Sequence, residues 1–287
     1  MNNKLLPKKS KKNIFLLSAI GLLHFCCITM AAHLDLFRRS EYSFASASNI
    51  CYWLWISSWW CIWVGWLTII WVIYKLTKKA KKSYFEQIFD LTVLIANLLM
   101  ILAFLANFII YYFWKVEWIY VPDTDNPHRV ITLFNSWPVK TQTYFWFNIA
   151  ISHIVVPFII LYHFLKFSQV DLLRKKFRTT IVSILANPAV WFLFVIIREK
   201  ISNYWIHPNK LSYEFPRNYP YVFFYRIMGQ QAYEKDINYS HSLVSRFLWL
   251  LGTILVAGLV FSLLTYFLIK WKEKINHKTL KNNIMKH

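Results

Sequence analysis

Residues 88–114 read IFDLTVLIANLLMILAFLANFIIYYFW, and Asp90 is their only charged residue. A helix needs about 20 apolar residues to cross the hydrocarbon layer of a bilayer, and this run is longer than that. Lipid offers no hydrogen-bond partners to the backbone, so a single segment that crosses it must be helical. The run therefore predicts a transmembrane helix.

The rest of the chain has the same character. Hydrophobic residues make up 57% of the 287 residues, charged residues make up 16%, and the mean hydropathy is +0.36. Soluble domains contain about 25% charged residues, and disordered chains have low hydrophobicity, so both classes are excluded. We predict an all-α polytopic membrane protein, a bundle of six transmembrane helices in a single domain, 1–287. The predicted spans are 14–32, 44–74, 88–114, 143–167, 179–197 and 247–269.

Charge placement predicts the orientation of the spans. The chain carries 33 Lys and Arg against 13 Asp and Glu, for a net charge of +20. Four segments on one side of the predicted spans hold 21 of the 33 basic residues. Basic residues accumulate in cytoplasmic segments, so we predict cytoplasmic termini in a plasma membrane, with 115–142 and 198–246 as outer loops. The basic start of the first run also leaves open that it is a cleaved signal peptide.

Several kinds of chemistry find no support in the sequence. The four cysteines lie inside apolar runs without metal-binding spacing, and no phosphate-binding loop or zinc-protease motif occurs. We predict no cofactor and no metal. The basic residues flank the spans, which predicts contacts with membrane lipids and anionic headgroups but no nucleic-acid partner.

Polar residues at membrane depth are the candidate site, because such groups are costly in lipid. His153 lies well inside the fourth run, and Asn148 is five residues earlier. A hydroxyl near a histidine is the minimal nucleophile–base pair, and an amide can stabilise an oxyanion. We predict that His153 pairs with a hydroxyl of the Ser43, Ser46 and Ser48 cluster as a catalytic pair, with Asn49 and Asn148 in support. The alternative is that these residues only pack helices together.

The length of the second run affects this pairing. Along a straight helix Ser46 would lie about 43 Å from Lys75, whereas His153 would lie only about 20 Å from Lys166. Both basic residues follow spans that end on the same side. The two groups therefore meet only if the second helix tilts, bends or protrudes from the membrane.

The last outer loop is rich in aromatic residues. Residues 215–226 read FPRNYPYVFFYR. Tyrosine favours the membrane interface, and arginine can pair with a carboxylate or phosphate. We predict Tyr219, Tyr221 and Arg226 as substrate-binding residues, and ordinary interfacial anchoring is the alternative.

Three stretches together resemble a known family. They are SFASASN at 43–49, HIVVP at 153–157 and NYPYVFF at 218–224. Their order on six spans resembles the bacterial Pr6Pr six-transmembrane proteins, and more distantly the androgen-induced and androgen-dependent membrane hydrolases. The resemblance covers nearly the whole chain.

The resemblance implies a function and assigns roles to two residues. The related hydrolases cleave lipid esters of hydroxy fatty acids with a threonine and a histidine, which would correspond to Ser46 and His153. Ser43 and Ser48 compete with Ser46 for the nucleophile's role. The resemblance thus implies a lipid ester hydrolase, and the alternative is a transporter or binding protein without catalysis, in which His153 and the intramembrane asparagines line a polar cavity.

Overall fold

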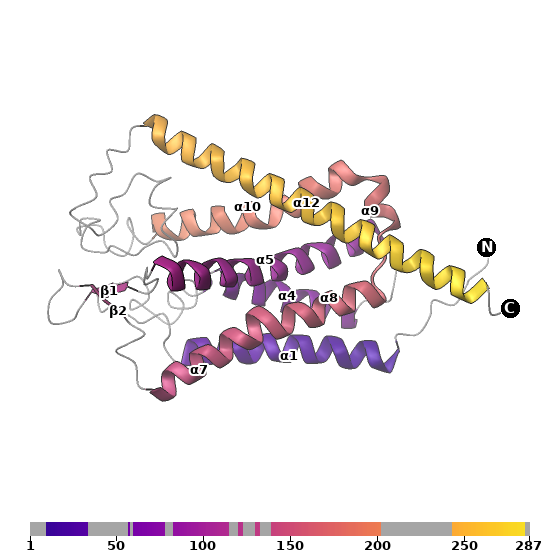
Figure 1. Ribbon diagram of the computed structural model, residues 1–287, viewed down its shortest axis with the longest axis horizontal. Helices are drawn as coiled ribbons and strands as arrows, with labels where there is room; N and C mark the ends of the chain where they lie inside the picture. The colour runs from indigo at the N-terminus through magenta and orange to yellow at the C-terminus, as the bar shows by residue number, and fades with distance from the viewer. Residues whose placement is uncertain are drawn as a thin grey trace. The chain divides into compact units, whose positions relative to one another are not determined.

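The computed structural model describes residues 10–33, 57, 60–77, 83–114, 120–122, 130–132, 139–201 and 243–284. The predicted all-α class is confirmed. The helices are α1 (Lys11–His33), α4 (Trp60–Thr77), α5 (Tyr84–Trp114), α7 (Val139–Ala150), α8 (Val156–Phe167), α9 (Asp171–Lys175), α10 (Phe177–Ile201) and α12 (Leu243–Ile284) (Figure 1). A π-helical turn, η1 (Ile151–Val155), joins α7 to α8.

Six helices are long and apolar enough to cross a membrane, as the sequence predicts. Much of their surface is apolar and open. In α12, for example, Leu255, Val256 and Leu259 are 62%, 64% and 62% exposed. Such surface is unfavourable in water but is well solvated by hydrocarbon. The protein is therefore a multi-pass membrane protein.

The predicted outer loop 115–142 contains a small hairpin. Strands β1 (Tyr120–Pro122) and β2 (Val130–Thr132) pair antiparallel, with Val121 opposite Ile131. Each strand has three residues, so the hairpin is a local feature, and most of the other residues that the structure describes are helical.

The run 44–74 does not form one continuous helix. Ser57 lies in a turn, and the described helix α4 begins at Trp60. Serine hydroxyls compete with the backbone for hydrogen bonds, so a serine pair such as Ser57 and Ser58 favours a helix start over a helix interior. Ser46 itself lies outside the described residues.

The chain divides into two compact units. The first contains 1–37, 64–80 and 96–167, and the second contains 38–63, 81–95 and 168–287. The prediction of a single domain stays a prediction.

In the first unit, two glycines bring α1 and α4 close together. A Cβ built on Gly21 would lie 3.1 Å from Val72 Cγ1. A Cβ built on Gly65 would lie 2.9 Å from Ile28 Cδ1 and 3.5 Å from His24 Nδ1. Small residues let helices approach closely in membranes, where dispersion contacts and hydrogen bonds drive association.

Gly65→Val is expected to destabilise the protein by about 1–3 kcal/mol, because the added branches overlap Ile28 in a packed interior. Thermal unfolding of the purified protein in detergent measures the effect. Gly252→Val is the matched control, since nothing lies within 4 Å of a Cβ at Gly252 in α12. Equal melting temperatures for the two variants would contradict close packing at Gly65.

In the second unit, polar bonds fasten the start of α5 to the residues around α9. Ser168 Oγ donates to Asp90 Oδ2 at 2.6 Å, and Gln87 Nε2 donates to Asp171 Oδ1 at 3.0 Å. The Gln87 side-chain oxygen accepts from the Leu172 backbone N–H at 3.0 Å. These bonds satisfy buried polar groups at the end of a span, which apolar packing alone would leave unpaired.

Aromatic contacts join α4 and α10 within the same unit. The rings of Trp60 and Trp191 meet edge to face, with centroids 5.0 Å apart. Trp63 Nε1 donates to Asn187 Oδ1 at 3.1 Å, and its ring packs against Phe194. An indole N–H needs a partner when it is buried, so Asn187 acts here as a structural acceptor.

Candidate functional site

His153, the predicted base, lies in the π-helical turn Ile151–Val155 of the first unit. The Val156 backbone N–H bonds to the Ile151 carbonyl five residues earlier, as a π turn requires. Pro157 explains why the helix widens here. In an α-helix its ring would clash with the His153 carbonyl, and it has no N–H to bond with that carbonyl. Single π turns of this kind occur often at functional sites.

Ser152 fixes the tautomer of the His153 ring. Ser152 Oγ lies 2.7 Å from the Asn148 carbonyl oxygen and 2.8 Å from His153 Nδ1. A hydroxyl has one proton, and a carbonyl can only accept. Both bonds coexist only if Ser152 donates to the carbonyl and Nδ1–H of His153 donates to Ser152. In the neutral ring the basic lone pair is then on Nε2.

Asn148 attaches this part of the chain to α1. Its Nδ2 donates to the Cys27 carbonyl at 3.0 Å, and Cys27 Sγ lies 4.0 Å from the Asn148 carbonyl oxygen. Asn148 and Ser152 are both 7% exposed, whereas His153 is partly exposed. The buried side of the π turn is therefore held in place next to a partly exposed histidine.

A second chain of hydrogen bonds runs through the interior of the first unit. Thr68 Oγ1 donates to the Val64 carbonyl at 2.8 Å, so it must accept from Asn97 Nδ2 at 3.0 Å. Asn97 Oδ1 then accepts from His24 Nε2 at 3.2 Å. All three side chains are buried, with at most 1% exposure. The order of donors assigns the proton of neutral His24 to Nε2.

A third histidine has a structural role. His163 Nε2 lies 2.9 Å from Asn13 Oδ1, and the Trp71 ring meets His163 edge to face with centroids 5.1 Å apart. His163 is 1% exposed. It joins α8 to α1 near the start of α1, and so it is distinct from the partly exposed His153.

The structure brings together only part of the predicted site. His153 and Asn148 lie in the same stretch of chain, and the Asn148 amide binds α1 rather than facing an open site. The other predicted site residues lie outside the described residues. They are Ser46, Asn49, Tyr219, Tyr221 and Arg226, together with the competing Ser43 and Ser48.

Sequence reasoning gave no role to Ser152 or to Thr68. The four-residue spacing of Asn148 and Ser152 was a usable signal, because it places both on one helix face. Thr68 and Asn97 belong to different helices, so their pairing has no signal in a single sequence.

Comparison of the chain with protein-family models, curated proteins and solved structures finds no match. Its site is therefore interpreted from its own residues. Within the described ranges, no group of three or more His, Cys, Asp or Glu side chains could hold a metal ion.

Proposed function

We propose that this protein is an intramembrane hydrolase of lipid acyl esters, with Ser46 as nucleophile and His153 as general base. The observation that carries the proposal is the hydrogen bond between Ser152 and His153 Nδ1, at 2.8 Å. In nucleophilic catalysis the base is itself oriented by a third group. Ser152 plays that part here, because its hydrogen bond to Nδ1 leaves the lone pair of the neutral ring on Nε2.

The reaction follows from these roles. The Ser46 hydroxyl gives its proton to His153 Nε2 while its oxygen attacks the ester carbonyl carbon. The tetrahedral intermediate collapses, the bond to the alcohol oxygen breaks, and the alcohol leaves with the proton from the imidazolium. Water then repeats the sequence on the acyl-serine and releases the fatty acid, which returns the enzyme to its starting state.

Ser152 is not the nucleophile in this proposal. Its proton is donated to the Asn148 carbonyl, and its side chain is buried. A nucleophile must instead give its proton to the base. Asn148 acts as a positioning residue, and Asn49 remains the proposed oxyanion donor.

Lipids are the proposed substrates because the site lies within a span. His153 belongs to the span Trp146–Phe167, so an ester carbonyl near the glycerol region of a lipid approaches it more easily than a soluble ester does. Tyr219, Tyr221 and Arg226 would contact the lipid headgroup from the last outer loop. The resemblance to the Pr6Pr proteins and to the androgen-induced and androgen-dependent membrane hydrolases, together with residence in the plasma membrane, forms part of this proposal.

A polar transport cavity is less well supported by the described residues. Both ends of the Asn97 amide are used inside the chain from His24 to Thr68. This use is typical of polar residues that hold membrane helices together. Flux of a lipid without any ester cleavage by the reconstituted protein would favour transport over hydrolysis.

The test of the proposal is release of fatty acid from long-chain acyl esters by the purified protein in lipid nanodiscs. Ser152→Ala is expected to lower kcat about fivefold, because one neutral hydrogen bond that sets the base is worth about 1 kcal/mol. The ¹⁵N spectrum of His153 should show more of the other tautomer in the same variant.

Ser262→Ala is the matched control for this variant. Ser262 Oγ also donates to the carbonyl four residues earlier, at 2.7 Å, but on α12. We expect unchanged kcat in Ser262→Ala. An equal loss in both variants would show a general effect on helix stability, and absence of turnover in the unaltered protein would reject the hydrolase.

A further inference from the structure

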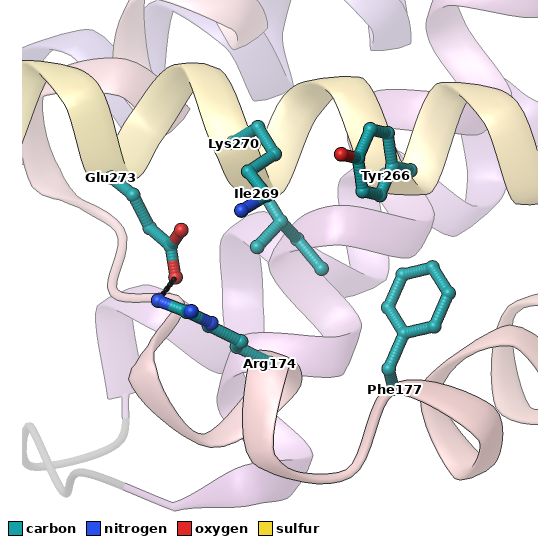
Figure 2. A pocket seen from close by; sticks show the side chains of 6 residues that line it. All are labelled: Arg174, Phe177, Tyr266, Ile269, Lys270 and Glu273. Atoms are coloured by element: carbon teal, nitrogen blue, oxygen red, sulfur yellow. Dashed lines mark hydrogen bonds and ion pairs between the residues drawn. The ribbon is translucent and has the colours of Figure 1, made fainter.

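A hollow of about 260 Å³ lies in the second unit, where α9, the start of α10 and α12 meet (Figure 2). It plays no part in the proposed hydrolysis. Its apolar walls are the Phe177 and Tyr266 rings, whose centroids lie 6.4 Å apart, and the Ile269 side chain. Its rim carries two cations, Arg174 and Lys270, and one carboxylate, Glu273. An apolar wall with a cationic rim matches the junction between the chains and the head of a lipid.

The charges around the hollow are strongly unbalanced. Residues 171–178 read DLLRKKFR and residues 270–274 read KWKEK, so seven basic residues stand against two acids. One acid, Asp171, accepts from Gln87, and the other, Glu273, pairs with Arg174. The surplus positive charge is placed to attract an anion.

Glu273 holds Arg174 at the rim without using up its donors. Arg174 Nη1 lies 3.3 Å from Glu273 Oε1, and this ion pair crosses from α9 to α12 (Figure 2). A guanidinium has five N–H donors, and the Arg174 side chain is 64% exposed. The Arg174 guanidinium therefore keeps N–H donors that can bind two phosphate oxygens at once. This bidentate arrangement is the strongest one between a guanidinium and a phosphate.

Lys270 supplies the second cation. Its Nζ lies 5.9 Å from the centroid of the Tyr266 ring, over the apolar wall. In α12 the apolar run ends here and the basic segment begins. Lys270 therefore lies at the level where a membrane helix leaves hydrocarbon, on the side that the basic residues predict to be cytoplasmic.

From these features we infer that the hollow binds the phosphate headgroup of an anionic phospholipid of the inner leaflet. Arg174 and Lys270 bind the phosphate, and Phe177, Tyr266 and Ile269 contact the upper part of an acyl chain. The exposed apolar side chains of α12 continue from the hollow, including Leu263 and Phe267, which are 48% and 61% exposed. A lipid can extend along this surface, whereas a free phosphate would gain nothing from it. Basic pockets between membrane helices on the cytoplasmic side are known to take such headgroups.

The test measures phosphatidylglycerol retained by the detergent-purified full chain in native mass spectrometry. The double variant Arg174→Ala with Lys270→Ala is expected to retain about tenfold less phosphatidylglycerol than the unaltered protein. Phosphatidylcholine retention should stay unchanged. An exposed ion pair contributes little stability, so the variant should fold, and its melting temperature without added lipid verifies this.

The control is Lys175→Ala with Lys274→Ala, which removes the same charge from α9 and α12. Neither residue lines the hollow, and both are exposed. We expect this variant to keep most of its phosphatidylglycerol. Equal losses of phosphatidylglycerol in the two double variants would mean that the lipid responds to overall positive charge and not to this hollow, which would overturn the inference. No loss in either variant would also overturn it. Displacement of the lipid by millimolar inorganic phosphate would assign the hollow to a free phosphate and also overturn the inference.

Discussion

Replacing His153 with alanine is expected to lower ester hydrolysis by about 10³-fold, because general base catalysis contributes on the order of 10²–10⁴ to a rate. His153 is the described group whose hydrogen bond to Ser152 leaves a basic Nε2 in a partly exposed position of a span. The measurement is kcat for a long-chain acyl ester with the purified variant in nanodiscs. KM should change little, since the imidazole reacts with the nucleophile rather than binding the lipid.

His277→Ala is the control for this loss. His277 is exposed in the last part of α12, so its removal should leave kcat within a factor of about two, as for most surface substitutions. Melting temperatures of both variants separate lost chemistry from lost folding. Turnover by a folded His153→Ala protein at the rate of the unaltered protein would remove His153 from the mechanism.

Ser46→Ala is expected to reduce hydrolysis to the uncatalysed background. Without the hydroxyl no acyl-serine can form, and the loss of a nucleophile typically costs more than the loss of its orienting groups. Release of labelled fatty acid under single-turnover conditions measures this loss. The double variant Ser46→Ala with His153→Ala should be no slower than Ser46→Ala alone, because the two residues act as one unit.

Ser43→Ala and Ser48→Ala test whether the nucleophile is correctly assigned. Both serines lie in the same stretch, SFASASN, so their replacement makes a similar change in composition and hydroxyl content. We expect both variants to keep turnover within a few fold. If either one loses all activity while Ser46→Ala remains active, that serine replaces Ser46 as nucleophile.

The fold class could be predicted because the bilayer restricts a spanning segment to very few structures. Each apolar run had to satisfy its own backbone hydrogen bonds, and six helices of sufficient length are found. The helix boundaries were harder to predict. In the run 44–74, tryptophans on both sides of Ser57 gave a continuous hydropathy signal, whereas the backbone turns at Ser57 and α4 starts at Trp60. Hydropathy records burial in lipid and contains no information on backbone direction.

Of the candidate site, the sequence could predict the residue that is unusual by its own position in a span. His153 stood out because a titratable ring is costly at membrane depth. Its orientation was not predictable, since it depends on a main-chain oxygen of Asn148 and on the π turn ahead of Pro157. Main-chain acceptors have the same chemistry at every position, so no sequence pattern marks the one that is used. The Asn148 bond to the Cys27 carbonyl escaped prediction for the same reason.

Covalent labelling with a lipid-like fluorophosphonate, followed by peptide mapping, tests the proposed catalytic pair most directly. Such a probe forms a stable bond only with a serine whose proton is taken by a base. We predict a single modified residue, Ser46, and loss of labelling in both Ser46→Ala and His153→Ala but not in Ser262→Ala. No labelling of the folded protein, or equal labelling after His153→Ala, would contradict the role of His153 as the base for a serine nucleophile.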